Sequence, residues 1–553
     1  MKQPAIGDPA QPLSVDYYRD NYRFLLEWVY QHHRPLLDED MRRDYHRFQA
    51  LSRDSQCLLV RMLSRKPTLF RRPQLDYPEI DVNNAISELQ QLGWLVSGDD
   101  FPYQQWLPLL LKSELFDVSH RYQLTTIKST SKAQLISDLA NHFDSLSVAP
   151  KSPVHWFALT IAGQFARFQL LFFGNAYQDL TEFTKTALGH VRYEQYTIRD
   201  DAVFPDRQAL QQYADWQQLK QRWRQADADP QRQIALAQQL LLARPAIGDS
   251  LLVVSQSSRI SNRIARHLER LQQLDSALQW YQLSQRHPAR ERQVRILAKQ
   301  GQLQAAWRLY QKICEDPWNI EEVENLKSVA KQLAKALRQP WSPSRPIAVA
   351  EQQLNLPTNS DVEQAVLAHY QQQGWQGIHG ENWLPLSLYG LACWDIIFSD
   401  QTQAFCHPFQ RAPRDLLSQR FYHRRRQLFE QRWQQLQQQP SQVLANMLSH
   451  FNDKHGIAND FVVWPRLTAT LISTWFNALT PTQWQYIWQY LAFDYRHHRS
   501  GFPDLWLLHP QHGIKLIEVK GPGDRLQSHQ RRWLARLQAA QLTIQVCYVS
   551  WCD

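Results

Sequence analysis

The chain has 553 residues, 43% of them hydrophobic, enough for several globular domains. Its formal net charge of +9 favours a polyanionic partner, because lysine and arginine displace counterions from phosphates. The sequence has no apolar run of about 18 residues and no signal-peptide core, which argues against a membrane-spanning or secreted protein. None of its six cysteines form a CxxC pair, which argues against a zinc ribbon or a disulfide framework. We therefore expect no membrane partner and a cytoplasmic, nucleoid-associated protein in a bacterium, or a nuclear one in a eukaryote.

A low glycine content predicts a mostly helical protein. The chain has only 17 glycines, whereas leucine, alanine, glutamine and arginine, which favour helices, are frequent. We expect a mainly α multidomain protein with a C-terminal α/β domain. Changes in pattern divide the chain into five predicted parts: residues 1–104, 105–150, 151–230, 231–346 and 347–553.

The first part, residues 1–104, has helical periodicity from Tyr17 to about Gly98. A helix that ends in a basic turn punctuated by prolines, then a second helix and GWLVSG, predicts a winged-helix-like unit. Two interpretations of the basic turn remain, contact with the DNA backbone and a solvated basic face. Its cations are Arg61, Arg65, Lys66, Arg71 and Arg72.

The next two parts are predicted to be helical. Residues 105–150 predict short helices, the last of them capped by Thr130 or Ser131. Residues 151–230 predict a helical connector.

Residues 231–346 contain an internal repeat. LDSALQWYQLSQRHP begins at Leu274, and LQAAWRLYQKICEDP begins 29 residues later at Leu303. Ala277 matches Ala306, and a proline ends each copy. Small residues at the close-packed position predict tetratricopeptide-like helix pairs, although the usual period is about 34 residues. The repeats either bind a protein partner or form a rigid spacer, and RQPWSPSRP (338–346) predicts a linker after them.

Residues 501–534, GFPDLWLLHPQHGIKLIEVKGPGDRLQSHQRRWL, predict two adjacent strands and a helix. Residues two apart share a strand face, so Glu518 and Lys520 point the same way and Ile517 points oppositely. Asp504 begins the partner strand and is expected beside Glu518. The helix brings Gln530, and LTIQVCYVSW predicts a third, buried strand.

These residue types suit phosphodiester hydrolysis. Carboxylate oxygens bind Mg²⁺ or Mn²⁺, which acidify water and stabilise charge on the phosphate, and two metal ions about 3.5–4 Å apart can do both. A lysine beside the metal can orient the attacking water. The other interpretation is a charged, exposed hairpin.

Longer strings carry a family resemblance. EVKGPGDRLQSHQRRWL (518–534) resembles the VRR-NUC domain, and the β-β-α-β order resembles restriction-endonuclease-like nucleases. GWQGIHGENWLPLSLYGLACWDIIF (374–398) and DYRHHRSGFPDL (494–505) are similar to the Fanconi-associated nuclease family. LSRKPTLFRR (63–72), residues 105–147, where that family has a SAP-like DNA-binding unit, and the tetratricopeptide-like helices follow in the family's order. The resemblance therefore covers most of the chain.

The resemblance implies a set of site residues. Glu381, Asp504, Glu518 and the carbonyl of Val519 match metal ligands for two Mg²⁺ or Mn²⁺ ions, Lys520 matches the catalytic lysine, and Gln530 matches a site organiser. Further matches concern DNA: Arg496 and Arg525 stand at basic positions near the cut strand, and His529 stands where some relatives have a lysine. A neutral histidine there would weaken a pocket for a 5′-phosphate.

Residues 411–432, RAPRDLLSQRFYHRRRQLFEQR, hold seven arginines, including Arg424 and Arg425, against two acids. Phosphate tracking with base stacking is one interpretation and a solvated helix face is the other.

These features predict a metal-dependent, structure-specific DNA nuclease. The resemblance implies cleavage near a 5′ flap, stepwise 5′-to-3′ degradation and a role in repair, including that of interstrand crosslinks. The expected partner is branched or flapped duplex DNA, and the appended DNA-binding parts favour a monomer. The alternatives are a Holliday-junction resolvase and a catalytically inert DNA-binding scaffold.

Overall fold

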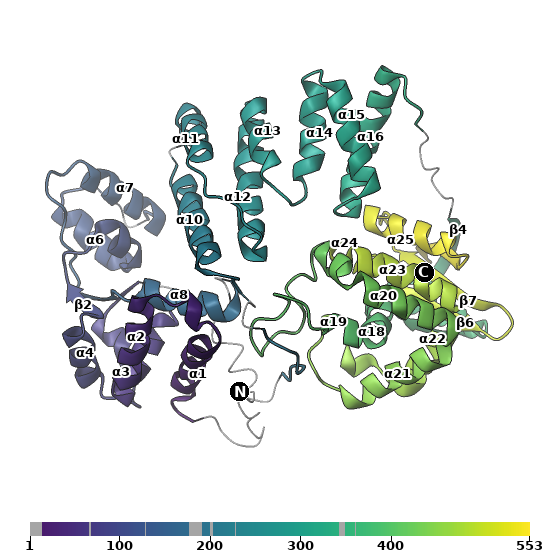
Figure 1. Ribbon diagram of the computed structural model, residues 1–553, viewed down its shortest axis with the longest axis horizontal. Helices are drawn as coiled ribbons and strands as arrows, with labels where there is room; N and C mark the ends of the chain where they lie inside the picture. Colours follow the sequence, from purple (N-terminus) through teal and green to yellow (C-terminus); the bar gives the residue numbers. More distant parts are fainter. Residues whose placement is uncertain are drawn as a thin grey trace. The chain divides into compact units, whose positions relative to one another are not determined.

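The computed structural model describes residues 14–65, 68–125, 127, 129–175, 178, 191–199, 203–226, 228–341, 349–359 and 361–552. The chain forms two compact units, residues 1–190 and 191–553 (Figure 1), and each is described by itself. None of the described helices is long and apolar enough to cross a membrane.

The first unit is helical around a small antiparallel sheet. Its helices are α1 (Tyr17–His32), η1 (Arg34–Leu36), α2 (Glu39–Ala50), α3 (Arg53–Leu63), η2 (Arg72–Leu75), α4 (Val82–Gln91), α5 (Tyr103–Trp106), η3 (Leu107–Leu109), α6 (Lys112–Arg121), α7 (Lys132–Asp144) and α8 (Ala162–Phe173). Its strands are β1 (Leu69–Phe70), β2 (Leu95–Gly98) and β3 (Trp156–Leu159). Side chains cap several helices, and Ser131 caps α7 as one of the two predicted capping residues, accepting a hydrogen bond from the Gln134 N–H.

The small sheet of the N-terminal unit includes a strand beyond residue 104, where the winged-helix-like part was predicted to end. The strand order is β1-β3-β2, so the central strand comes last in the chain. Helices α5 to α7 are therefore an insertion between β2 and β3, and α8 packs back on α1 through Phe165 and Tyr22, whose ring centroids are 5.9 Å apart. The first residues of the predicted connector 151–230 therefore complete the sheet of the N-terminal unit.

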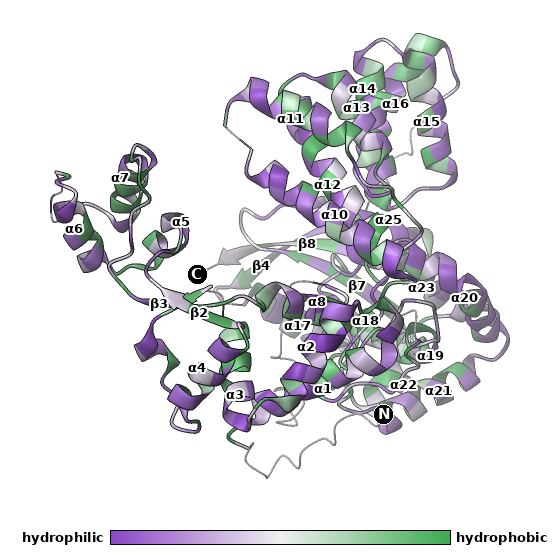
Figure 2. Ribbon diagram, turned by 60° about the vertical axis from the view of Figure 1, so that its left-hand side comes forward, coloured by the Kyte–Doolittle hydropathy of each residue, from purple (hydrophilic) through white to green (hydrophobic). Residues whose placement is uncertain are grey.

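The second unit contains a row of antiparallel helices (Figure 1). They are α10 (Arg207–Arg224), α11 (Pro230–Leu242), α12 (Leu251–Arg270), α13 (Leu274–Gln282), α14 (Ala289–Lys299), α15 (Leu303–Glu315) and α16 (Ile320–Leu337). The repeated residues Ala277 and Ala306 are completely buried, as expected where small side chains let helices approach closely. Figure 2 shows hydrophilic and hydrophobic bands on these helices.

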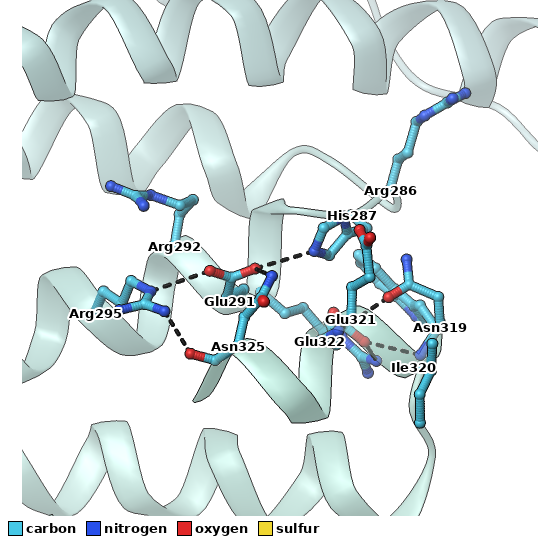
Figure 3. A network of polar contacts seen from close by, with 12 residues as sticks. Arg286, His287, Glu291, Arg292, Arg295, Asn319, Ile320, Glu321, Glu322 and Asn325 are labelled. Atoms are coloured by element: carbon cyan, nitrogen blue, oxygen red, sulfur yellow. Dashed lines mark hydrogen bonds and ion pairs between the residues drawn. The ribbon is translucent and has the colours of Figure 1, made fainter. Parts of the chain in front are cut away.

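Polar contacts join the last helices of this row. Arg290 on α14 makes a two-point contact with the buried Glu322 on α16, with distances of 3.0 and 2.6 Å. Figure 3 shows Glu291 between His287 and Arg295, each 3.0 Å from a carboxylate oxygen. Such charge-assisted contacts hold the stack in one arrangement.

The C-terminal nuclease-like domain is built on a five-stranded mixed sheet in the order β4-β8-β7-β6-β5. Its strands are β4 (Ala350–Pro357), β5 (Gln376–His379), β6 (Leu505–His509), β7 (Gly513–Lys520) and β8 (Thr543–Cys552). Its helices are α17 (Val362–Gln372), α18 (Trp383–Ala392), α19 (Trp394–Ile397), α20 (Arg420–Gln438), α21 (Pro440–Asp453), η4 (Trp464–Arg466), α22 (Ala469–Asn477), α23 (Pro481–Phe493), α24 (Tyr495–His498) and α25 (Ser528–Ala539).

The sheet has an apolar layer on each face. Leu516 and Val546 belong to the larger cluster with α18, α23 and α25, whereas Ile517 and Val519 belong to the smaller one with α17. The hairpin β6–β7 is antiparallel, β7 pairs in parallel with β8, and Leu505 lies opposite Ile517. This confirms the predicted strands and their alternation.

Residues 191–199 also belong to this domain, although about 150 residues separate them from β4. The ring of Tyr196 stacks on Phe405 with centroids 3.9 Å apart, and its hydroxyl donates to the His407 carbonyl at 2.8 Å. Glu194 accepts a hydrogen bond from the Trp394 indole at 2.6 Å. The predicted connector 151–230 is therefore divided among the N-terminal unit, this segment and the start of the repeats.

Candidate active site

Asp504 lies immediately before β6 and fixes the end of the hairpin. Its Oδ2 accepts a hydrogen bond from the Val519 N–H at 2.7 Å, so the carboxylate lies across the strand pair beside Glu518. The sequence-based placement of these two acids is confirmed by this contact.

Glu518 is completely buried near the end of β7. Its Oε1 accepts hydrogen bonds from Lys520 Nζ at 2.6 Å and from Gln530 Nε2 at 2.5 Å. Its Oε2 has no hydrogen-bond partner among the described residues. Buried carboxylate oxygens are normally paired, and a cation at this oxygen would supply the partner that it lacks.

The two acids resist losing their protons together. Burial raises the pKa of Glu518 to about 8, and the nearby charge of Asp504 adds to the shift. Burial raises the pKa of Asp504 to about 6, with contributions from Glu363 and Glu381, although the Val519 N–H and Lys520 oppose it. A bound cation offsets these costs.

Glu381 comes from a different part of the chain, just before α18. Its backbone N–H donates to the Asp504 carbonyl at 3.1 Å, which places the two acids on neighbouring segments. Its φ of +35° is unusual for a residue with a side chain. Its side chain is 46% exposed and accepts a hydrogen bond from Asn382 Nδ2 at 2.7 Å.

The donor set fits a divalent cation of the Mg²⁺ or Mn²⁺ type, because it consists of hard carboxylate oxygens, one of them buried and unpaired. Within the described part of the chain, no three His, Cys, Asp or Glu side chains are already grouped as a metal site. Three hydrogen bonds engage these acids instead: Lys520 and Gln530 donate to Glu518 Oε1, and Asn382 donates to Glu381.

Gln530 connects the first turn of α25 to the site. Its Oε1 accepts the Gln527 N–H at 2.9 Å, and its amide nitrogen donates to Glu518. One side chain therefore both caps the helix and contacts the acid, and the organising role of Gln530 stays a prediction.

The predicted DNA residues near the site lie at or close to the surface. Arg496 on α24 and Arg525 in the loop before α25 are exposed. His529 is half-buried, and burial with the charges of Arg532 and Lys520 lowers its pKa, so the ring is neutral at pH 7.

Arg424 and Arg425 differ in their surroundings. Arg425 is 1% exposed and donates to Asp415 Oδ2 at 2.9 Å and to the Phe421 carbonyl at 3.2 Å. Its side chain is part of the core, which removes it from the expected DNA contacts. Arg424 is partly exposed and donates to Asp415 and to the Thr402 carbonyl.

The basic residues of the N-terminal unit are also engaged. Arg71 makes a two-point contact with Glu114 at 2.6 and 2.7 Å, and Arg61 pairs with Glu79 at 2.6 Å. Arg65 donates to the Gln74 carbonyl and lies over the Tyr77 ring, 5.4 Å from its centroid. Arg72 donates to Asn83 Oδ1. Lys66 lies outside the described residues.

Two residues near the site were not predicted. Glu363 in the first turn of α17 raises the pKa of Asp504 by its charge, and Asn382 contacts Glu381. An acid in a first helical turn is common for reasons of the helix dipole, so Glu363 carried no distinguishing signal. Asn382 follows Glu381 directly in the quoted GIHGEN string, which was the only pointer to it.

A mixed sheet that carries Asp504, Glu518 and Lys520 at one end of its hairpin, followed by the Gln530 helix, defines a nuclease domain of the VRR-NUC class. The VRR-NUC domain model matches residues 438–551, a span that excludes Glu381, and a second model, described as "FAN1, HTH domain", matches residues 16–96.

Whole-chain relatives extend the match. A Fanconi-associated nuclease 1 homolog of Pseudomonas aeruginosa is 30% identical over 99% of this chain and 98% of its own length. Human Fanconi-associated nuclease 1 is 26% identical over 98% of this chain, which spans 63% of the human protein. A crystal structure of paFAN1 bound to DNA with a 2-nucleotide 5′ flap and a gap superposes with a TM-score of 0.82, 30% identity and full coverage of both chains. The chain belongs to the Fanconi-associated nuclease family and is a structure-specific DNA-cleaving hydrolase, which confirms the predicted family.

Proposed function

We propose that this nuclease requires Mg²⁺ or Mn²⁺, cleaves DNA near a 5′ flap, degrades DNA stepwise from 5′ ends and acts in repair, including that of interstrand crosslinks. The flap preference is supported by the likeness to paFAN1 in complex with 5′ flap DNA. The observation that carries the metal dependence is the buried Glu518, whose second oxygen lacks a hydrogen-bond partner among the described residues.

The residues would divide the work as follows. Glu381, Asp504, Glu518 and the Val519 carbonyl would hold two cations, which would supply an activated water and neutralise the phosphate. Lys520, 2.6 Å from Glu518, would hold the attacking water or donate to the scissile phosphate once the carboxylate turns to a cation. Gln530 would keep Glu518 directed at the site.

DNA would be held by phosphate contacts rather than by base reading. Arg496, Arg525 and Arg424 on the nuclease domain are the proposed contacts near the cut, with Arg65 and Arg72 on the N-terminal unit. The neutral His529 would grip a 5′-phosphate weakly, so we expect a loose dependence on the 5′ end. The protein would act as a monomer, and the repeats would serve as a spacer or bind a protein partner.

Labelled 5′-flap, 3′-flap, single-stranded and Holliday-junction DNAs, incubated with Mg²⁺, Mn²⁺ or EDTA, test this proposal. We expect cleavage of the 5′ flap near the junction with metal only, and none with Asp504→Asn. Symmetric cutting of the Holliday junction by a dimer would favour the resolvase alternative. Cleavage in EDTA, or wild-type activity in Asp504→Asn, would overturn the site.

A further inference from the structure

The side chain of Asn382 lies between two segments of the site. Its Nδ2 donates to Glu381 Oε1 at 2.7 Å, and its Oδ1 accepts the Phe502 N–H at 3.2 Å. The first contact holds a proposed metal ligand. The second holds the backbone two residues before Asp504, another proposed ligand.

The two contacts need opposite chemistry from one short side chain. A carboxamide offers a donor and an acceptor, whereas an aspartate would offer only acceptors and would repel Glu381. Glu381 itself adopts a φ of +35°, and its N–H is bound to the Asp504 carbonyl. The backbone at this turn is therefore already fixed, and Asn382 fixes the side chain.

The segment on the other side of Asn382 is equally fixed. A Cβ at Gly501 would come within 2.6 Å of His529 Cδ2 and 3.0 Å of the His529 carbonyl carbon, so this segment lies directly against α25. The ring of Phe502 stacks on Trp533 of the same helix with centroids 3.7 Å apart. Through Phe502, Asn382 thus ties Glu381 to the helix that also carries Gln530.

We propose that Asn382 is a positioning residue that sets the direction of the Glu381 carboxylate relative to Asp504 for a divalent cation. The inference rests on the proposed function, since it takes Glu381 and Asp504 as ligands. Glu381 is the ligand with the most exposed side chain, so it depends most on a neighbour to restrict its rotamers. Partners that orient ligands in this way commonly change metal affinity or activity by about 10–100-fold.

The test compares Asn382→Ala with the wild type in the full-length protein. We expect the Mn²⁺ dissociation constant, measured by calorimetry without DNA, to rise about tenfold. The Mn²⁺ concentration for half-maximal cleavage should rise by the same factor, while kcat at saturating Mn²⁺ returns to within about threefold of the wild type. If Asn382 were needed only for folding, its loss would not raise the Mn²⁺ requirement while kcat at saturating Mn²⁺ stayed close to that of the wild type.

Two further variants keep the test decisive. Asn382→Leu preserves much of the volume while removing both hydrogen bonds, and it should show the same loss of Mn²⁺ affinity if the alanine variant folds poorly. Asn355→Ala is the matched control. Asn355 is an exposed asparagine on β4, two strands from β7 in the sheet, and it accepts a hydrogen bond of 2.8 Å from Ser550. It should bind Mn²⁺ as the wild type does.

Glu518→Ala separates the inference from the proposed function. Wild-type Mn²⁺ affinity in a folded Asn382→Ala or Asn382→Leu protein would overturn the role of Asn382 alone, provided that Glu518→Ala loses Mn²⁺ binding. Unchanged Mn²⁺ binding in Glu518→Ala would overturn the site itself, and the inference with it.

Discussion

The hairpin β6–β7 with the proposed site and the basic segment 61–72 of the N-terminal unit were both identified by residue type, but their charged side chains have different surroundings in the structure. In the hairpin, two acids lie at one end of two strands; burial raises the pKa of both, and the charge of Asp504 raises that of Glu518 further. In the basic segment, Arg61 and Arg71 pair with the glutamates Glu79 and Glu114. In the hairpin, Lys520 faces more than one carboxylate, which makes this region a candidate cation site. In the basic segment, Arg61 and Arg71 are each paired with an acid, which gives them a structural role.

Removing the buried acid should have the largest effect. Glu518→Ala should lower single-turnover cleavage of a labelled 5′ flap by on the order of 10³-fold, because the proposed cation loses a ligand and Lys520 its partner. Binding of the same DNA in Ca²⁺ should change little. The control is Glu430→Ala on α20, an exposed acid that pairs with Arg426 at 2.7 Å and should keep full activity.

A fully active Glu518→Ala enzyme would remove the distinction between the two regions, because the gathered charge of the hairpin would then have no catalytic meaning.

The next largest effect is expected in the pH dependence of stability, where the buried Glu518 of the hairpin should make a contribution that the ion pairs of the basic segment do not. Burial raises the pKa of Glu518 to about 8, above its usual value near 4.5, so its stabilising contribution is complete below 4.5 and is lost as the pH rises through 8. In EDTA, the melting temperature of the wild type minus that of Glu518→Gln should therefore fall between pH 5 and 9. Taking the difference between the two melting temperatures removes the contributions of groups that titrate alike in both proteins.

Mn²⁺ should counteract that loss, since the ligands must be deprotonated to bind it. Its stabilisation of the wild type should be larger at pH 8 than at pH 6, and nearly absent in Glu518→Gln. A metal effect independent of pH would contradict the raised pKa values.

The sequence predicted the hairpin because strand alternation is a local rule. It placed Glu518 and Lys520 on one face, with Ile517 opposite, and the helix with Gln530 followed directly. Glu381 lies more than a hundred residues upstream, and only the family resemblance pointed to it. No spacing rule could do so, because its place depends on a backbone hydrogen bond to Asp504 in the folded chain.

Domain boundaries were predicted less well for the same reason. The central strand β3 follows an insertion, and Tyr196 packs into a domain whose first strand begins at Ala350. Both depend on pairing between distant segments. The burial of Arg425 was not predicted, because the sequence of an arginine-rich helix does not show which arginine faces a distant acid such as Asp415 and which faces solvent.

Neighbouring arginines test the structural interpretation of the basic segment. Arg71→Ala should lower the free energy of unfolding of the N-terminal unit by about 2 kcal/mol, because it breaks a partly buried two-point ion pair and a contact with the Trp156 ring. Arg72→Ala, which loses one hydrogen bond to Asn83, should cost about 0.5 kcal/mol or less. Chemical denaturation measures both, and equal costs would contradict the assignment.

The smallest expected effect concerns Arg65, and it decides whether this arginine contacts the DNA backbone or belongs to a solvated basic face. Arg65 is exposed and gives one hydrogen bond to a backbone carbonyl, so its charge is available to phosphate. Arg65→Ala should weaken duplex binding by about twofold to threefold at low salt and reduce the slope of log affinity against log salt by about one. An unchanged slope would identify a solvated basic face, whereas a reduced slope with unchanged stability would show that the segment keeps free charge for DNA beside arginines already committed to the fold.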